Sequence, residues 1–111
     1  MYNGIRYGLR LSLYKSEKFF GPGVASLLRL VCQKGSLRMA AQEMGMAYSK
    51  AWRVIKTAST ELGFPLLASQ TGGKHGGGAQ LTPEGQAFLE RYTAMDEALQ
   101  AQAKILFAKY F

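Results

Sequence analysis

Hydrophobic residues recur with helical spacing along the middle of the chain. A first helix is predicted by apolar positions three and four residues apart, and it should end near Gly35, which tolerates the left-handed conformation of a helix end. Ser36 is then placed to cap a second helix. A third helix is predicted from about residue 48 to residue 62, with Gly63 as its end. The apolar positions of the first helix are Val24, Leu27, Leu28 and Val31.

The pattern changes at the N-terminus and after the third helix. Residues 5–14 alternate apolar and polar side chains, which predicts a half-buried strand at a sheet edge, followed by a turn region over residues 15–23. Residues 66–71 and 79–82 predict two short strands joined as a hairpin. The expected fold class is mainly α with a small β-wing, a winged helix-turn-helix with a long C-terminal helix.

The pattern of residues 35–56 predicts a helix-turn-helix. Gly45 follows Ala41 by four residues, where a tight turn between two helices needs a residue that accepts positive φ. The third helix has no obvious cap, so either Ser49 caps a later start or tertiary contacts satisfy its first N–H groups. Its outward positions suit phosphates and base edges, so we expect double-stranded DNA as the partner. These positions are Tyr48, Ser49, Lys50, Arg53 and Lys56.

Roles on this helix follow from side-chain chemistry. Arg53 and Lys50 are the candidates for base edges, because arginine paired with guanine is the commonest specific contact. Ser49, Lys56 and Tyr48 are better suited to phosphates. Trp52 is either a core anchor or a partly exposed stacking surface, and Arg38 is either solvated or a backbone contact.

The segment GGKHGGG between the two short strands predicts a wing over residues 72–78. Its glycines allow close approach to a phosphate chain, and Lys74 and His75 could contact it. It is not a P-loop, because Ala68 and the residue after Lys74 do not match that pattern. No His, Cys or carboxylate stands at ligand spacing from the histidine, so no metal is expected.

Thr82 as N-cap and Pro83 as first residue predict a helix that runs to Phe111. Its length would be about 42 Å, longer than a small domain can cover, so its apolar stripe should pair with a second copy in a homodimer. The alternative is that the helix folds back on its own core or frays after Gln102. We expect one structural unit, with residues 1–82 as the winged helix and 83–111 as the dimerisation helix. The stripe comprises Phe88, Tyr92, Met95, Leu99 and Leu106.

Charge supports a polyanionic partner. The 111 residues carry a net charge of +7. Residues 1–80 hold 11 Lys and Arg against 3 Asp and Glu, or +8, whereas residues 81–111 hold 3 against 4, or −1. Such a field attracts nucleic acid, and equally anionic membranes or acidic proteins.

Several classes are not supported by the sequence. It has no long apolar run for a membrane span and no signal peptide, so we expect a cytoplasmic protein. Cys32 is the single cysteine and is expected to be a buried, inert thiol. One histidine and scattered carboxylates predict no catalytic residues and no cofactor. The alternatives to a DNA-reading regulator are a protein-interaction module and a non-specific nucleic-acid binder.

Three motifs in order make the resemblance specific. They are Ala-Tyr-x-x-Ala-Trp at residues 47–52, the glycine-rich run at residues 71–79, and Leu-Thr-x-x-Gly at residues 81–85. Together they resemble the N-terminal DNA-binding domain of the ModE family of molybdate-responsive regulators, a winged helix related to the LysR type. The resemblance implies that helix 48–62 enters the major groove, that the wing contacts the flanking backbone, and that the long helix pairs two subunits. It also suggests a link to genes of molybdenum transport or metabolism. The molybdate-binding domains of that family would follow Phe111, so molybdate is not expected to bind this chain.

Overall fold

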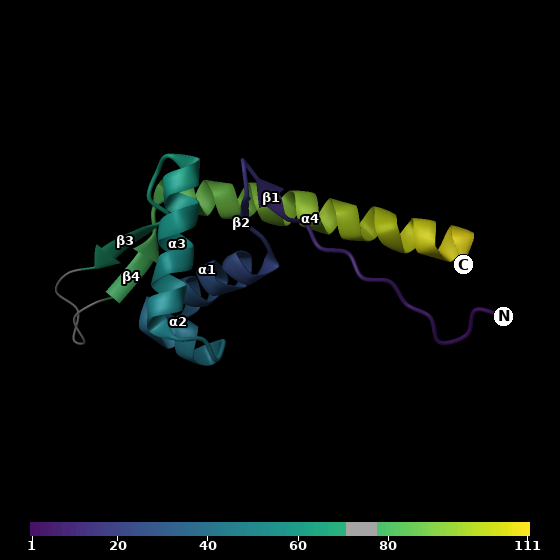
Figure 1. Ribbon diagram of the computed structural model, residues 1–111, viewed down its shortest axis with the longest axis horizontal. Helices are drawn as coiled ribbons and strands as arrows, with labels where there is room; N and C mark the ends of the chain where they lie inside the picture. The colour runs from purple at the N-terminus through teal and green to yellow at the C-terminus, as the bar shows by residue number, and fades with distance from the viewer. Residues whose placement is uncertain (71–77) are drawn as a thin grey trace.

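The computed structural model describes residues 1–70 and 78–111, most of which are helical (Figure 1). Three helices form a compact body, a two-stranded antiparallel hairpin stands beside it, and a long helix leaves it at the C-terminus. The mainly helical class with a small wing is thereby confirmed. The elements are α1 (Pro22–Lys34), α2 (Leu37–Glu43), α3 (Tyr48–Leu62), β3 (Leu67–Gln70), β4 (Gly78–Leu81) and α4 (Pro83–Tyr110).

The turns of the helix-turn-helix form as their local residues predict. Gly35 ends α1 with φ 69°, and its N–H donates to the carbonyl of Val31. The hydroxyl of Ser36 accepts a hydrogen bond from the N–H of Met39 at 3.1 Å and so caps α2. Gly45 has φ 68°, the conformation that the turn between α2 and α3 requires.

The first residue of α3 tests the expectation that Ser49 caps a later start of this helix. The helix begins at Tyr48, and its N-cap Ala47 gives no side-chain hydrogen bond. Ser49 lies inside the first turn, so the expectation that it caps a later start is wrong. The side chain of Ser49 is exposed at this end of the helix.

The hydrophobic core contains both small and large apolar side chains. Ala40, Ala51 and Ala58 are fully buried and let α2 and α3 approach the rest of the body closely. The large side chains that are buried with these alanines fill most of the volume of the core. These are Phe20, Leu27, Leu28, Val31 and Leu66.

Cys32 is exposed, so the expectation of a buried thiol is wrong. It follows Val31, which is fully buried, and each helical step turns the next side chain by about 100°. That rotation places Cys32 at the edge of the buried face, with its sulfur 3.9 Å from the side-chain oxygen of Gln86.

The N-terminal segment differs from its prediction. Only Leu13–Tyr14 forms a strand (β1), and it pairs with Lys18–Phe20 (β2), with Leu13 opposite Phe20. The prediction of a strand over residues 5–14 is therefore wrong for residues 5–12, which form no strand. The prediction of a turn over residues 15–23 is wrong for Lys18–Phe20, which form β2. Alternation indicates an extended chain with one apolar side, but it does not supply a neighbouring strand.

The extended residues before β1 run along α4 instead (Figure 1). The side-chain amide of Gln100 donates to the carbonyl of Leu9 at 3.0 Å, and the rings of Tyr7 and Phe107 lie 4.9 Å apart. The hydroxyl of Tyr92 donates to the carbonyl of Leu11 at 2.8 Å. Burial raises the pKa of Tyr92 above its ordinary value, and the nearby carboxylate of Asp96 raises it further.

The wing is joined to α4 by one residue. Thr82 donates its N–H to the carbonyl of Leu66 at 3.0 Å, and its hydroxyl accepts from the N–H of Gly85 at 2.9 Å. The predicted cap at Thr82 is confirmed. On the other side of the hairpin, the N–H of Ala79 donates to the carbonyl of Gly35 at 3.0 Å. The wing is thus fixed both to α4 and to the turn between α1 and α2.

Candidate nucleic-acid interface

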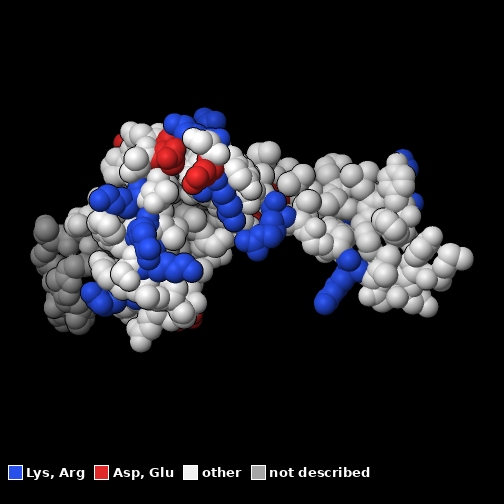
Figure 2. All heavy atoms as spheres, viewed as in Figure 1, with Lys and Arg blue, Asp and Glu red and all other residues white. Residues whose placement is uncertain are grey.

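The outer face of α3 carries the five residues that the sequence singles out. Ala51, Ile55 and Ala58 face the core, and the opposite side of the helix is exposed. Figure 2 shows Lys and Arg side chains gathered over α3 on the face that it displays. The five predicted residues, all of them exposed, are Tyr48, Ser49, Lys50, Arg53 and Lys56.

Two aromatic rings stand among these cations. Trp52 is 49% exposed, so of its two expected roles the structure gives the partly exposed surface rather than the core anchor. The ammonium of Lys56 lies 4.8 Å from the Trp52 ring, and the guanidinium of Arg38 on α2 lies 4.2 Å from the ring of Tyr48. Such contacts orient long basic side chains at the surface.

A hollow of about 390 Å³ separates α3 from the wing. Tyr48, Trp52 and Lys56 line it from α3, and Leu67 and Ala79 line it from the hairpin. The aromatic and cationic side of α3 therefore faces β3 and β4. Lys74 and His75, the predicted wing contacts, lie outside the described residues.

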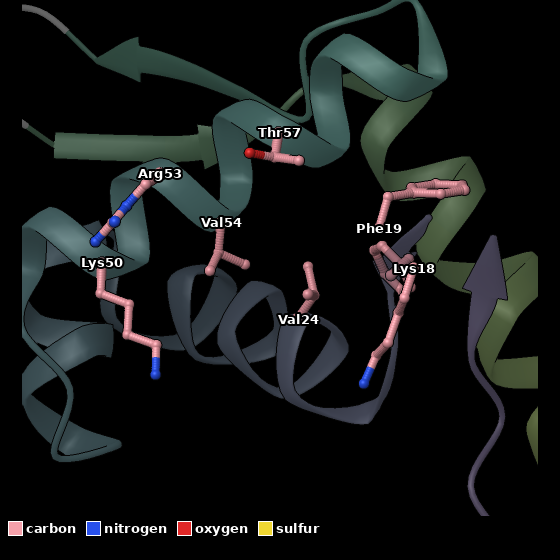
Figure 3. A pocket seen from close by; sticks show the side chains of 8 residues that line it. Lys18, Phe19, Val24, Lys50, Arg53, Val54 and Thr57 are labelled. Atoms are coloured by element: carbon pink, nitrogen blue, oxygen red, sulfur yellow. The ribbon is translucent and has the colours of Figure 1, made fainter. Parts of the chain in front are cut away.

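A second hollow of about 430 Å³ lies on the other side of α3 (Figure 3). Lys50, Arg53 and Thr57 line it from α3, and Val24 lines it from α1. Lys18 of β2 completes its basic rim. The sequence predicts a turn at Lys18 and no role for it, because no local signal indicates that pairing with β1 brings this residue beside α3.

The expected dimer stripe on α4 divides into two parts. Tyr92 is 4% exposed, and both it and half-buried Phe88 stack on Phe20 with ring centroids 4.9 Å apart. Leu99 is partly buried against the same core. Farther along, α4 projects beyond the three-helix body (Figure 1). The large apolar side chains exposed on this helix and at its end are Met95, Ile105, Leu106, Tyr110 and Phe111.

The described part of the chain has neither a cluster of metal ligands nor a membrane-spanning helix. Within residues 1–70 and 78–111, no group of three His, Cys, Asp or Glu side chains is placed to hold a metal ion. No helix in the same ranges is long and apolar enough to cross a membrane.

A helix-turn-helix whose second helix has an exposed outer face, followed by a two-stranded hairpin beside that helix, defines the winged helix-turn-helix class. Residues 25–86 match the profile of the bacterial regulatory helix-turn-helix proteins of the LysR family. The chain belongs to that family.

Two relatives match the chain in sequence, and one solved structure matches it in fold. The chain is 36% identical over 81 residues to the molybdenum-pterin-binding protein MopB of Rhodobacter capsulatus, covering 73% of this chain and 29% of MopB. It is 33% identical over 97 residues to the transcriptional dual regulator ModE of Escherichia coli, covering 86% of this chain and 37% of ModE. The chain thus spans about a third of the length of these relatives. The fold resembles the CbnR_DBD–DNA complex with a TM-score of 0.64 and 21% identity, covering 80% of this chain and 97% of that one.

Proposed function

We propose that this chain is a sequence-specific double-stranded DNA-binding transcriptional regulator that acts as a homodimer. The observation that carries the proposal is the exposed row of basic and hydroxyl side chains on α3, next to a wing, in a chain of a regulatory helix-turn-helix family. The name of the relative MopB, a molybdenum-pterin-binding protein, supports a connection with genes of molybdenum transport or metabolism. Reading by α3 in the major groove is the arrangement that such a helix favours.

The proposed roles divide by chemistry. Arg53 and Lys50 contact base edges, and Ser49 and Tyr48 contact phosphates. Lys56 also contacts phosphate, because its ammonium is held near the Trp52 ring on the side of the wing. The wing, with Lys74 and His75, adds contacts to the flanking backbone.

Dimer formation is proposed through the distal half of α4. A helix of 28 residues extends about 42 Å, and its far end carries exposed apolar side chains such as Ile105, Leu106 and Tyr110. Burial of such a face by a second copy is the ordinary solution for a helix that its own chain does not cover. The N-terminal segment covers part of this end through Tyr7, so the second copy would use the remainder.

The reading role of Arg53 is tested by Arg53→Ala in fluorescence-anisotropy titrations. A duplex selected from a randomised pool is compared with a scrambled duplex over a series of salt concentrations. Loss of a bidentate guanine contact should weaken the selected complex by about 1–3 kcal/mol, roughly 5-fold to 150-fold, and the scrambled complex much less. Arg91→Ala, which removes an exposed arginine from α4, serves as the matched control.

Each other outcome has a definite meaning. If Arg53→Ala lowers the affinity for both duplexes equally, Arg53 contacts the DNA backbone and does not read bases. Equal binding of the two duplexes by the unaltered chain would identify a non-specific binder. Absence of DNA binding at low salt would reject the DNA-reading function and favour a protein-interaction module.

Dimerisation is tested by measuring molar mass with light scattering. The unaltered chain should have twice the mass of one chain, and Leu106→Glu should approach the monomer, because a carboxylate cannot be buried in an apolar interface without large cost. Ala108→Glu is the control, since it adds the same charge at an exposed position about 200° around the helix. A monomeric unaltered chain, or dissociation by the control alone, would contradict the proposed interface.

A further inference from the structure

We propose that the DNA interface continues from α3 onto the β1–β2 hairpin, where Lys18 binds the sugar-phosphate backbone beside the groove read by α3. The inference rests on the proposed DNA-binding function and extends it to a residue outside the helix-turn-helix. It starts from the hollow that Lys18, Lys50 and Arg53 share.

The fold places Lys18 beside α3. Strand pairing sets Lys18 opposite Tyr14, and β2 leads directly into α1. The aliphatic end of Lys18 lies over Gly21, where an added Cβ would stand 3.2 Å from its Cε atom. Figure 3 shows the ammonium groups of Lys18 and Lys50 pointing out on the same side of the hollow, with Val24 and Val54 between them.

The lining of the hollow fits a sugar-phosphate chain. Its rim is basic, and none of the described residues that line it is acidic. Its floor is made of apolar groups from Phe19, Val24 and Val54. A nucleic-acid backbone alternates anionic phosphates with less polar sugars, so it can bind both parts of this surface. Base reading is not assigned to Lys18, because it lies on the hairpin and not on the helix that would enter the groove.

Lys18 lies outside the residues that match the family profile. The LysR-family profile begins at residue 25, after the β1–β2 hairpin. Lys50 and Arg53 fall inside the matched residues, whereas Lys18 falls outside them. Within this chain, the hairpin thus adds a basic side chain to the surface that Lys50 and Arg53 form on α3.

The test is the salt dependence of DNA binding by Lys18→Gln, with Lys15→Gln as the matched control. Both lysines are exposed and lie on the same hairpin, but only Lys18 lines the hollow. One lost phosphate contact should reduce the slope of log affinity against log salt by about 0.9, which corresponds to roughly fivefold to tenfold weaker binding at 0.1 M salt. The selected and scrambled duplexes should be weakened equally, while Lys15→Gln keeps the slope of the unaltered chain.

The outcomes separate this inference from the function on which it rests. If the unaltered chain binds DNA and Lys18→Gln keeps its full salt slope, the hairpin contact is wrong and the function stands. Equal loss of slope in both lysine variants would also overturn it, because a general charge effect would then explain the result. Loss of preference for the selected duplex would assign Lys18 to base reading instead. If the unaltered chain binds no DNA, the proposed function fails first. Unchanged circular-dichroism melting of both variants confirms that folding is not responsible.

Discussion

Phe20→Ala is expected to lower the free energy of unfolding by about 3–5 kcal/mol, the range for removing a large aromatic side chain from a core. Phe20 is fully buried, and its ring packs edge-on against Phe88 and Tyr92 with centroids 4.9 Å away in each case. It is the side chain through which β2 is held to α4. Since domains of this size are stable by about 5–15 kcal/mol, the variant should be largely or partly unfolded at moderate temperature.

Urea denaturation followed by circular dichroism measures this loss. Phe19→Ala is the matched control, because Phe19 precedes Phe20 on the same strand but is only partly buried. Its loss of stability should be clearly smaller. Equal losses in the two variants would show that Phe20 does not hold the hairpin to α4 as described.

Gly85→Ala is expected to destabilise the chain by about 1–3 kcal/mol or more, the cost of overpacking a tight core site. A Cβ on Gly85 would stand 2.5 Å from the carbonyl oxygen of Leu66 and 3.2 Å from its carbon. Alanine is preferred over glycine within a helix by about 1 kcal/mol, which opposes the clash. The clash should win, because the neighbour is backbone that Thr82 also binds and cannot rotate away.

Gly23→Ala makes the same substitution in the first turn of α1, where an added Cβ meets nothing within 4 Å. Here the helix preference acts alone, so stability should stay the same or rise by up to about 1 kcal/mol. Thermal melting of the two variants measures the contrast. A Gly85→Ala variant as stable as the unaltered chain would mean that the contact between α4 and the wing can relax.

Local signals account for what the sequence predicted correctly. Ser36, Gly45, Gly63 and Thr82 each act within a few residues, and each ends or begins an element where it was expected to. Such caps and turns depend on backbone geometry more than on the rest of the fold. For the same reason, the helical period predicts five exposed residues of α3 correctly, although it does not decide the exposure of Trp52.

Long-range packing accounts for the errors. The alternation at Tyr7 and Leu9 reflects contact with α4, about ninety residues away along the chain. The α4 stripe appeared continuous, yet Tyr92 is covered by Phe20 of the same chain, which helical spacing cannot reveal. The place of Lys18 beside α3 likewise depends on a two-stranded pairing that has no strong local signal.

The single residue between β4 and α4 has a consequence for the arrangement of binding sites. Thr82 is hydrogen-bonded to Leu66, which precedes the wing, and to Gly85 of α4. The wing and the long helix should therefore move together as one rigid unit. In a dimer built on α4, the distance and angle between the two copies of α3 would then be set by how the long helices cross. One inserted base pair rotates a half-site by about 34–36° around the duplex axis, and a rigid dimer cannot rotate one copy of α3 by this angle relative to the other. The two copies should therefore accept half-sites at one separation and tolerate few others.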